Sequence, residues 1–419
     1  MTQLAFYVFC LLLFLALFQT LFAGIFVSLF FRKTKAVVAD EQLPRAAILL
    51  SLRGADPYLA QGLRCLMQQN YPDYELHIVI DRRDDPAWEV AEQAKTEAGH
   101  AAVHLMALRQ PLPTCSLKCS ALVQMVSGLE ESREVVVLAD ADLVSHAGWL
   151  RELVVPLCDP CVGATFGNRW FVPHHGHWGS LVRYLWNVAA VVPMWLCNIP
   201  WGGTFAIRTK VLRECGLVEK WARAVVEDAP MRQALADQGL RLQFVPSLMM
   251  VNREDCTLPF SLDFVKRQLT WTRLYHSRWW FVVGHAISTT TVMAVSLLLM
   301  LAGWTRGETQ TALWAAAGLG AYLLAMIVLT VVLESGVRHV VRARGEPMAR
   351  PTPRVLACLP AAILLTQWVH MTAVALAMLN RYVTWRGATY RIAGPWDVRL
   401  VHYRPFEHRA ETAGSNMSL

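Results

Sequence analysis

The stretch VVVLADADLVSHAGWL, from Val135 to Leu150, places two carboxylates directly after an apolar run. Val135 to Leu138 predict a buried strand, and Asp140 and Asp142 follow where that strand ends. The stretch contains no lysine or arginine that could neutralise them. Two interpretations are open at this point, since aspartate favours turns and paired carboxylates also bind metal ions.

Around this stretch, short apolar runs alternate with helical patterns over residues 44–260. The strand-like runs are RAAILLSL (45–52), ELHIVID (75–81), AAVHLMAL (101–108), EVVVLAD (134–140) and LRLQFVP (240–246). PYLAQGLRCLMQQ (57–69) and DPAWEVAEQAKTEA (85–98) have helical patterns. The alternation predicts an α/β domain with a mainly parallel, Rossmann-like sheet. Ligands of such sheets bind beyond the carboxyl ends of the strands, where Asp81, Asp140 and Asp142 are expected.

The composition indicates a membrane protein. Of the 419 residues, 55% are hydrophobic and 17% are charged, whereas about a quarter are charged in soluble domains. Residues 4–31 carry no charge and precede RKTK, which predicts an N-terminal transmembrane anchor over residues 1–31. A membrane region is predicted over 282–379, with apolar segments at about 282–303, 312–333 and 355–379. The arginines that give the net charge of +7 cluster beside these segments, which argues for a lipid surface and against nucleic acid.

The C-terminal half raises a question of topology. Residues 261–281 are rich in arginine and tryptophan and predict an amphipathic helix in the membrane interface. Arginines between 338 and 354 place that loop in the cytoplasm, and the tail over 380–419 is also basic. Three full spans would put the tail outside. Either 355–379 is re-entrant or interfacial, or the positive-inside rule fails here.

Six motifs occur along the chain in a recognisable order. They are IDRRDDPAWEV (80–90), LADADLVSHAGWL (138–150), NIPWGGTFAIRTKVL (198–212), VVEDAPMRQALADQG (225–239), KRQLTWTR (266–273) and VTWRGATYRI (383–392). The order resembles that of membrane-bound GT-A glycosyltransferases of family two, and most closely the ceramide glucosyltransferase branch, family twenty-one. The resemblance covers nearly the whole chain and implies a GT-A fold for the α/β domain.

The resemblance also implies roles for individual side chains. Asp228 would be the general base, and Asp142, with Asp140 beside it, would bind Mg²⁺ or Mn²⁺ on the diphosphate of the donor. Thr270 stands where relatives carry an arginine in a Gln/Arg-x-x-Arg-Trp motif. The expected nucleotide-sugar-binding residues are Asp81, Asp84, Asp85, Lys118, Asp140, Arg267 and Trp271. The expected acceptor-binding residues are Trp201, Gly202 and Gly203.

The resemblance implies an inverting transfer of a hexose from a UDP-sugar, with glucose expected, to a hydroxyl of a membrane lipid such as ceramide. The catalytic domain would face the cytoplasm, where nucleotide sugars are made. A hopanoid or other bacterial lipid glycosyltransferase using UDP-N-acetylglucosamine is the close alternative. A processive polysaccharide synthase fits less well, because few spans are predicted for a secretion channel. A non-enzymatic lipid transporter or scaffold would not depend on Asp142 and Asp228.

Overall fold

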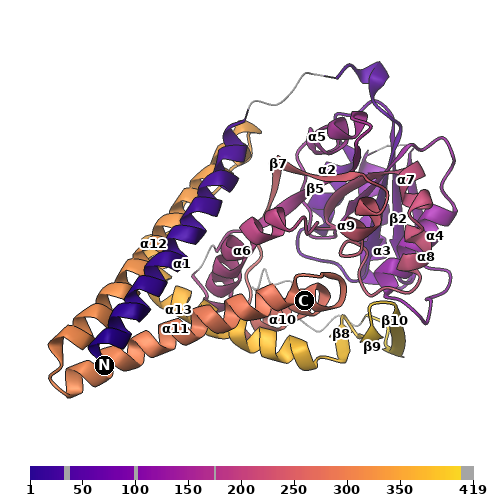
Figure 1. Cartoon of the computed structure of the whole chain (residues 1–419). Coiled ribbons are helices and arrows are strands. Elements are labelled where there is room, and N and C mark those ends of the chain that lie inside the picture. The colour runs from indigo at the N-terminus through magenta and orange to yellow at the C-terminus, as the bar shows by residue number, and fades with distance from the viewer. Residues whose placement is uncertain (33–37, 99–101, 174–175, 407–419) are drawn as a thin grey trace.

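The computed structural model describes residues 1–32, 38–98, 102–173 and 176–406 (Figure 1). Within these residues the α/β domain contains a seven-stranded sheet in the order β3-β2-β1-β4-β6-β5-β7. Only β6 among these strands runs against the others, so the predicted mainly parallel sheet is confirmed. The strands are β1 (Ala46–Leu52), β2 (Tyr74–Ile80), β3 (Val103–Ala107), β4 (Val135–Ala139), β5 (Val162–Phe171), β6 (Thr204–Arg208) and β7 (Arg241–Asn252).

Helices cover both faces of the sheet, which explains why β4 is apolar at every position. Val136 and Leu138 enter one core, while Val135, Val137 and Ala139 enter the other. The second core includes residues of α2 (Leu59–Met67), α3 (Pro86–Ala98) and α5 (Trp149–Val154). The first includes residues of α4 (Leu117–Ser127), α6 (Trp178–Leu196), α7 (Thr209–Glu214), α8 (Leu217–Trp221) and α9 (Met231–Ala236), and continues into the membrane helices.

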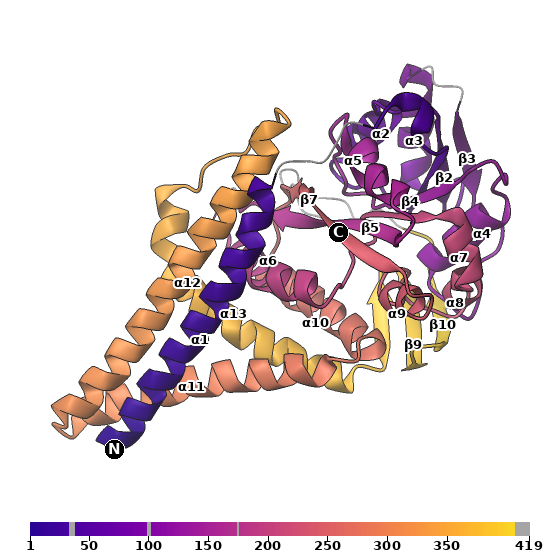
Figure 2. The same cartoon turned by 45° about the horizontal axis from the view of Figure 1, so that its top comes forward.

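The described residues include four helices that are long and apolar enough to cross a membrane, as an integral membrane protein requires. They are α1 (Thr2–Ser28, extended by a 3₁₀ turn to Phe31), α11 (Trp279–Thr305), α12 (Thr309–Ala343) and α13 (Pro353–Leu379). Helices α1 and α12 run side by side, away from the α/β domain (Figures 1 and 2). A Cβ on Gly318 would lie 3.0 Å from Phe9 Cα, so this glycine lets the two helices approach closely.

The predicted interfacial helix over 261–281 is divided between two elements. Helix α10 (Leu258–Tyr275) packs against α6 and α13, and the chain then breaks before α11 begins at Trp279. Thr257 caps α10, because its hydroxyl accepts a hydrogen bond from the Phe260 amide. Trp279 and Trp280 therefore belong to the first turn of a membrane helix rather than to the end of the interfacial one.

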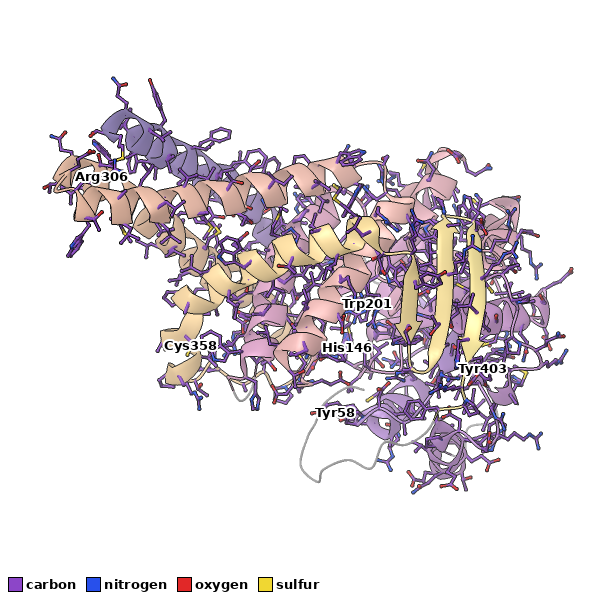
Figure 3. The ribbon with its side chains drawn as sticks, turned by 90° about the horizontal axis from the view of Figure 1, so that it is seen from below. Tyr58, His146, Trp201, Arg306, Cys358 and Tyr403 are labelled. Atoms are coloured by element: carbon purple, nitrogen blue, oxygen red, sulfur yellow. The ribbon has the colours of Figure 1, made fainter. Side chains whose placement is uncertain are left out.

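Both ends of α13 lie against parts of the chain outside the membrane bundle. At its start, a Cβ on Gly176 would contact Arg354 and Val355. At its end, Arg273 of α10 donates hydrogen bonds to the carbonyl oxygens of Met378 (2.6 Å) and Asn380 (2.7 Å). The link between α11 and α12, where Arg306 lies, is at the far end of the molecule (Figure 3). This geometry favours the re-entrant or interfacial alternative for α13.

The tail beyond α13 is more ordered than a basic tail suggests. It forms a three-stranded antiparallel sheet of β8 (Tyr382–Trp385), β9 (Ala388–Gly394) and β10 (Asp397–Tyr403), which lies beside the α/β domain (Figure 3). The described part of the tail contacts the α/β domain through Tyr390, and the α12–α13 link contacts it through Arg344, which binds the Ser247 and Met249 carbonyl oxygens. This agrees with the positive-inside rule. Residues 407–419 of the predicted tail lie outside the described residues.

This topology predicts the outcome of proteolysis in sealed vesicles. An epitope tag after residue 419 should be digested together with the α/β domain when the protease reaches that side. A tag inserted at Gly307, in the link between α11 and α12, should be protected in the same vesicles. A C-terminal tag that is protected while the α/β domain is digested would contradict the placement of α13.

Candidate active site

The carboxylates after β4 receive their counter-charges from other elements. Lys118 Nζ, on α4, lies 2.5 Å from Asp140 and 2.6 Å from Glu227. Arg169, on β5, lies 3.6 Å from Asp140 and 3.7 Å from Asp142. These residues are distant in sequence but meet beside the carboxyl end of β4. Strand β6 is the neighbour of β4 and β5 follows β6 in the sheet, so Arg169 reaches the aspartates across β6.

Asp140 and Asp142 differ in how well they are compensated. Burial alone would raise the pKa of Asp140, but Lys118 and Arg169 outweigh burial and hold that pKa below its ordinary value. Burial raises the pKa of Asp142, and the negative charges of Asp140 and Asp56 raise it further. Arg169 lowers this pKa but does not offset the other effects. Asp142 is therefore the carboxylate of the pair with less compensating positive charge.

Asp142 is a better candidate metal ligand than Asp140, because its oxygens have fewer partners. One Asp140 oxygen binds Lys118 and the other accepts a 2.9 Å hydrogen bond from Trp201 Nε1. Asp142 Oδ2 accepts from Asn252 Nδ2 at 3.0 Å, and the carboxylate lines a cavity of about 320 Å³ with Tyr58. A hard divalent cation takes one or two carboxylates plus phosphate oxygens, so Asp142 fits such an ion. Asp140 fits better as the partner of Lys118 and Trp201.

A second group of possible metal ligands lies elsewhere on the sheet. Oxygen and nitrogen atoms of Glu75, His77 and His104 lie within 4.8 Å of one another on β2 and β3. Glu75 is at the amino end of β2 and is bound at 2.5 Å by Arg133. The predicted metal residues follow the carboxyl end of β4, so this group is separate from them.

Asp228 has the environment of a base that works near neutral pH. Its Oδ2 accepts a 2.8 Å hydrogen bond from the Gly202 amide. Burial and the neighbouring Glu227 raise the pKa of Asp228 to about 7, although Lys118 pulls it in the opposite direction. A carboxylate with such a pKa can accept a proton from a hydroxyl and release it again.

The predicted acceptor residues hold this arrangement together. A Cβ on Gly202 would lie 2.0 Å from Glu227 Oε1, and one on Gly203 would lie 2.2 Å from the Trp201 ring. Only glycine fits at these positions without moving a carboxylate or an indole. The guanidinium carbon of Arg169 lies 4.5 Å from the Trp201 ring, so this tryptophan also positions the arginine between the aspartates.

The three predicted nucleotide-binding aspartates after β2 have different surroundings. Asp81 is buried, forms an ion pair with Arg53 and accepts a 2.8 Å hydrogen bond from the Tyr403 hydroxyl. The Asp85 carboxylate accepts hydrogen bonds from the Gly54 and Ala87 amides, each at 2.9 Å. It therefore holds the loop after β1 against the start of α3. Asp84 is exposed and pairs with Arg82. Asp81 is thus the member of this set that contacts the C-terminal sheet, through Tyr403.

The C-terminal sheet docks against the ends of β1 and β2 and the start of α4. Arg386 adopts a φ of 47° and donates hydrogen bonds to Asp56 and to the Arg53 carbonyl oxygen. The Tyr390 hydroxyl accepts from the Leu117 amide at 3.1 Å, at the start of α4. The WRGATY motif therefore docks the sheet beside Asp81. Sequence reasoning missed the contacts of Arg53, Arg169 and Tyr403, and the WRGATY motif was the one signal for this sheet.

Helix α10 provides a half-buried cation, Arg267, whose guanidinium carbon lies 5.9 Å from the Phe264 ring that Arg169 also faces. Arg267 has no ion pair among the residues that the structure describes, and burial together with Arg169 and Arg386 lowers its pKa to about 10. Such a group gains stability when an anion binds it. Thr270 is buried and accepts from Asn380 Nδ2 at 3.1 Å, so this departure from the relatives serves the packing of α10 on the end of α13. Trp271 is half-buried and packs against the same core.

The family model for glycosyl transferase family 21 matches residues 10–395 of the chain. The chain belongs to glycosyl transferase family 21. This match confirms both the resemblance and the GT-A fold class predicted for this family 21 protein.

Several solved structures are similar to the chain. A mannosyltransferase from Pyrobaculum calidifontis, solved with GDP-Man and Mn²⁺, is 17% identical and has a TM-score of 0.47, with 90% of this chain and 98% of that chain covered. Glucosyl-3-phosphoglycerate synthase from Mycobacterium tuberculosis, solved with Mn²⁺ and UDP-glucose, is 14% identical and has a TM-score of 0.38, with 57% and 84% covered. Similarity at this level carries no conclusion about the substrate of the family 21 protein.

The docking of the C-terminal sheet can be tested by substitution. Arg386→Ala leaves the buried Asp56 carboxylate without its cation, which should destabilise the docked sheet by about 3–5 kcal/mol. Hydrogen exchange should accelerate over residues 382–403 while the strands of the large sheet remain protected. Arg391→Ala, an exposed position on β9, is the control and should leave exchange unchanged. Unchanged protection in Arg386→Ala would contradict this anchoring role.

Proposed function

We propose that this family 21 protein transfers a hexose, with glucose expected, from a UDP-sugar to a hydroxyl of a membrane lipid such as ceramide, with inversion at the anomeric carbon. The observation that carries the proposal is the position of Asp228. Its carboxylate has a pKa of about 7 and adjoins Glu227, whose Lys118 partner also binds Asp140. A base beside donor-binding carboxylates is what a direct displacement needs.

In the proposed reaction, Asp228 accepts the proton of the acceptor hydroxyl while that oxygen attacks the anomeric carbon. The bond between this carbon and the diphosphate oxygen breaks, and UDP leaves with the electron pair. Because one base acts in one displacement, the configuration inverts. Asp81 lies where the nucleoside would bind, and Arg169 and Arg267 are the cations available to the diphosphate.

Asp142 would hold a Mg²⁺ or Mn²⁺ ion, for which its undercompensated carboxylate is suited. When bound, such an ion neutralises charge on the leaving diphosphate. Asp140 remains with Lys118 and Trp201 and contacts the sugar nucleotide from that position.

The lipid acceptor is supported by the continuity between the site and the membrane helices. Helix α10 carries Arg267 and packs against α6 and α13, and one core joins the sheet to residues such as Val283 and Ile363. The arginines between 338 and 354 favour a cytoplasmic position for the loop and, on this account, for the catalytic domain.

Membranes containing the protein should transfer radiolabel from one member of a panel of UDP-sugars to extractable lipid, and EDTA should abolish the transfer. Asp142→Ala and Asp228→Ala membranes serve as the matched inactive controls. Labelled polymer in place of glycolipid would favour a synthase, and labelling from UDP-N-acetylglucosamine alone would replace the expected hexose. Equal labelling by both variants and the wild type would overturn the proposal.

The pKa of Asp228 predicts the pH dependence of this activity. The base acts in its deprotonated form, so kcat/KM should rise with pH through about 7 and level off above it. Asp228→Asn should reduce kcat by about 10²–10⁴-fold without this dependence. Asp237→Asn, at an exposed position after α9, should retain the wild-type profile. A profile that falls between pH 6 and 8 would contradict the role of Asp228.

A further inference from the structure

A group of polar side chains lies outside the proposed active site, where α13 packs against α6 and α11. We call Trp186, Thr289, Gln367 and His370 the interfacial polar cluster. Trp186 Nε1 donates a 3.2 Å hydrogen bond to His370 Nδ1, and the Thr289 hydroxyl lies 3.4 Å from Gln367 Oε1. Polar groups on apolar helices of this kind are costly and call for a functional explanation.

The hydrogen bonds leave the cluster with unused donors. An indole nitrogen can only donate, so His370 Nδ1 accepts and the neutral ring carries its proton on Nε2. The Thr289 hydroxyl lies nearer to the His285 carbonyl oxygen, at 2.8 Å, than to Gln367, so Thr289 occupies at most one Gln367 amide proton and leaves at least one donor on Nε2. Neither His370 Nε2 nor Gln367 Nε2 has a partner among the residues that the structure describes. The two side chains are three residues apart on one helix face and are half-buried, so a ligand can reach both.

One aromatic ring separates this cluster from the arginines of the proposed active site. The Trp186 and Phe264 rings meet edge to face, with centroids 6.0 Å apart. The guanidinium carbons of Arg169 and Arg267 each lie 5.9 Å from the Phe264 ring. A molecule that spans the width of this ring would therefore reach from the cluster to the edge of the site.

The surroundings of the cluster are apolar. Phe264, Trp186, Val282 and Met371 belong to or pack against the same hydrophobic core, and α11 and α13 are apolar enough to lie in a bilayer. A ligand bound here must bring hydrogen-bond acceptors to the free donors and apolar groups to the walls. An acyl carbonyl attached to a hydrocarbon chain has both properties.

We propose that the interfacial polar cluster is the subsite that recognises the acyl carbonyl of the acceptor lipid. His370 Nε2 and the Gln367 amide donate to this oxygen, the hydrocarbon chain lies along α11 and α13, and the free hydroxyl extends past Phe264 toward the proposed active site. The substrate class is a lipid that carries both an amide or ester carbonyl and a free hydroxyl. The inference rests on the proposed lipid glycosyltransferase function.

The test compares acceptor kinetics in the full-length protein. His370→Phe and Gln367→Leu should each raise the acceptor KM about tenfold, the effect of one lost buried hydrogen bond, and leave the KM of the UDP-sugar within about twofold. His370→Gln retains an N–H donor and should recover part of the loss. Thr372→Ala, at an exposed position on the same helix, is the matched control.

A second experiment compares two acceptor lipids, first in the wild-type protein and then in the variants. Wild-type protein should use an acyl acceptor with a KM about tenfold or more below that of its alkyl ether analogue, which lacks the carbonyl. In His370→Phe and in Gln367→Leu the difference between the two acceptors should shrink, and in the double variant the two acceptors should become equivalent. Equal use of both analogues by the wild type, or an unchanged acceptor KM in both variants, overturns the inference and leaves the proposed function intact. If no lipid is labelled from any UDP-sugar, the proposed function and this inference are both wrong.

Discussion

The arrangement of the site depends on the ammonium group that Lys118 shares between Asp140 and Glu227. Four carboxylates meet at the carboxyl end of β4, and so much negative charge is unstable in a partly buried crevice without cations close by. Lys118 neutralises two of them, and Arg169 lies between Asp140 and Asp142. Asp142 and Asp228 are left with raised pKa values, and these are the two groups to which the proposal assigns metal binding and proton transfer.

Arg169, one of the cations that compensate the carboxylates, also connects the site to the membrane helices. Arg169 is flanked by the Trp201 and Phe264 rings, and Phe264 belongs to α10, which the end of α13 holds through Arg273 and Asn380. The buried Glu334 of α12 accepts hydrogen bonds from Trp170 and Tyr184 of the domain and from Arg338 of its own helix. The α/β domain is therefore fixed to the membrane helices by polar contacts at two places, one through α10 and α13 and one through α12.

Much of this could be predicted from the sequence, because local patterns carry it. The five predicted runs correspond to β1, β2, β3, β4 and β7, and the apolar segments to the membrane helices. Strands β5 and β6 were missed, since VGATFGNRWF mixes glycine and polar residues and TFAIR is short. Asp140, Asp142 and Asp228 were predicted through their motifs, and Lys118, Glu227 and Arg169 connect them in the structure. Arg53, Arg169 and Tyr403 were not, because sheet order and the docking of β10, rather than sequence spacing, bring them to the site.

The central claim is that the donor binds at the carboxyl ends of β2 and β4. A structure of the full-length protein with UDP and Mn²⁺, with the ion located by its anomalous scattering, tests this most directly. The account predicts a peak at coordination distance from Asp142, about 2.1 Å, with the nucleoside beside Asp81. A peak confined to Glu75, His77 and His104, or a nucleoside bound away from Asp81, would contradict it.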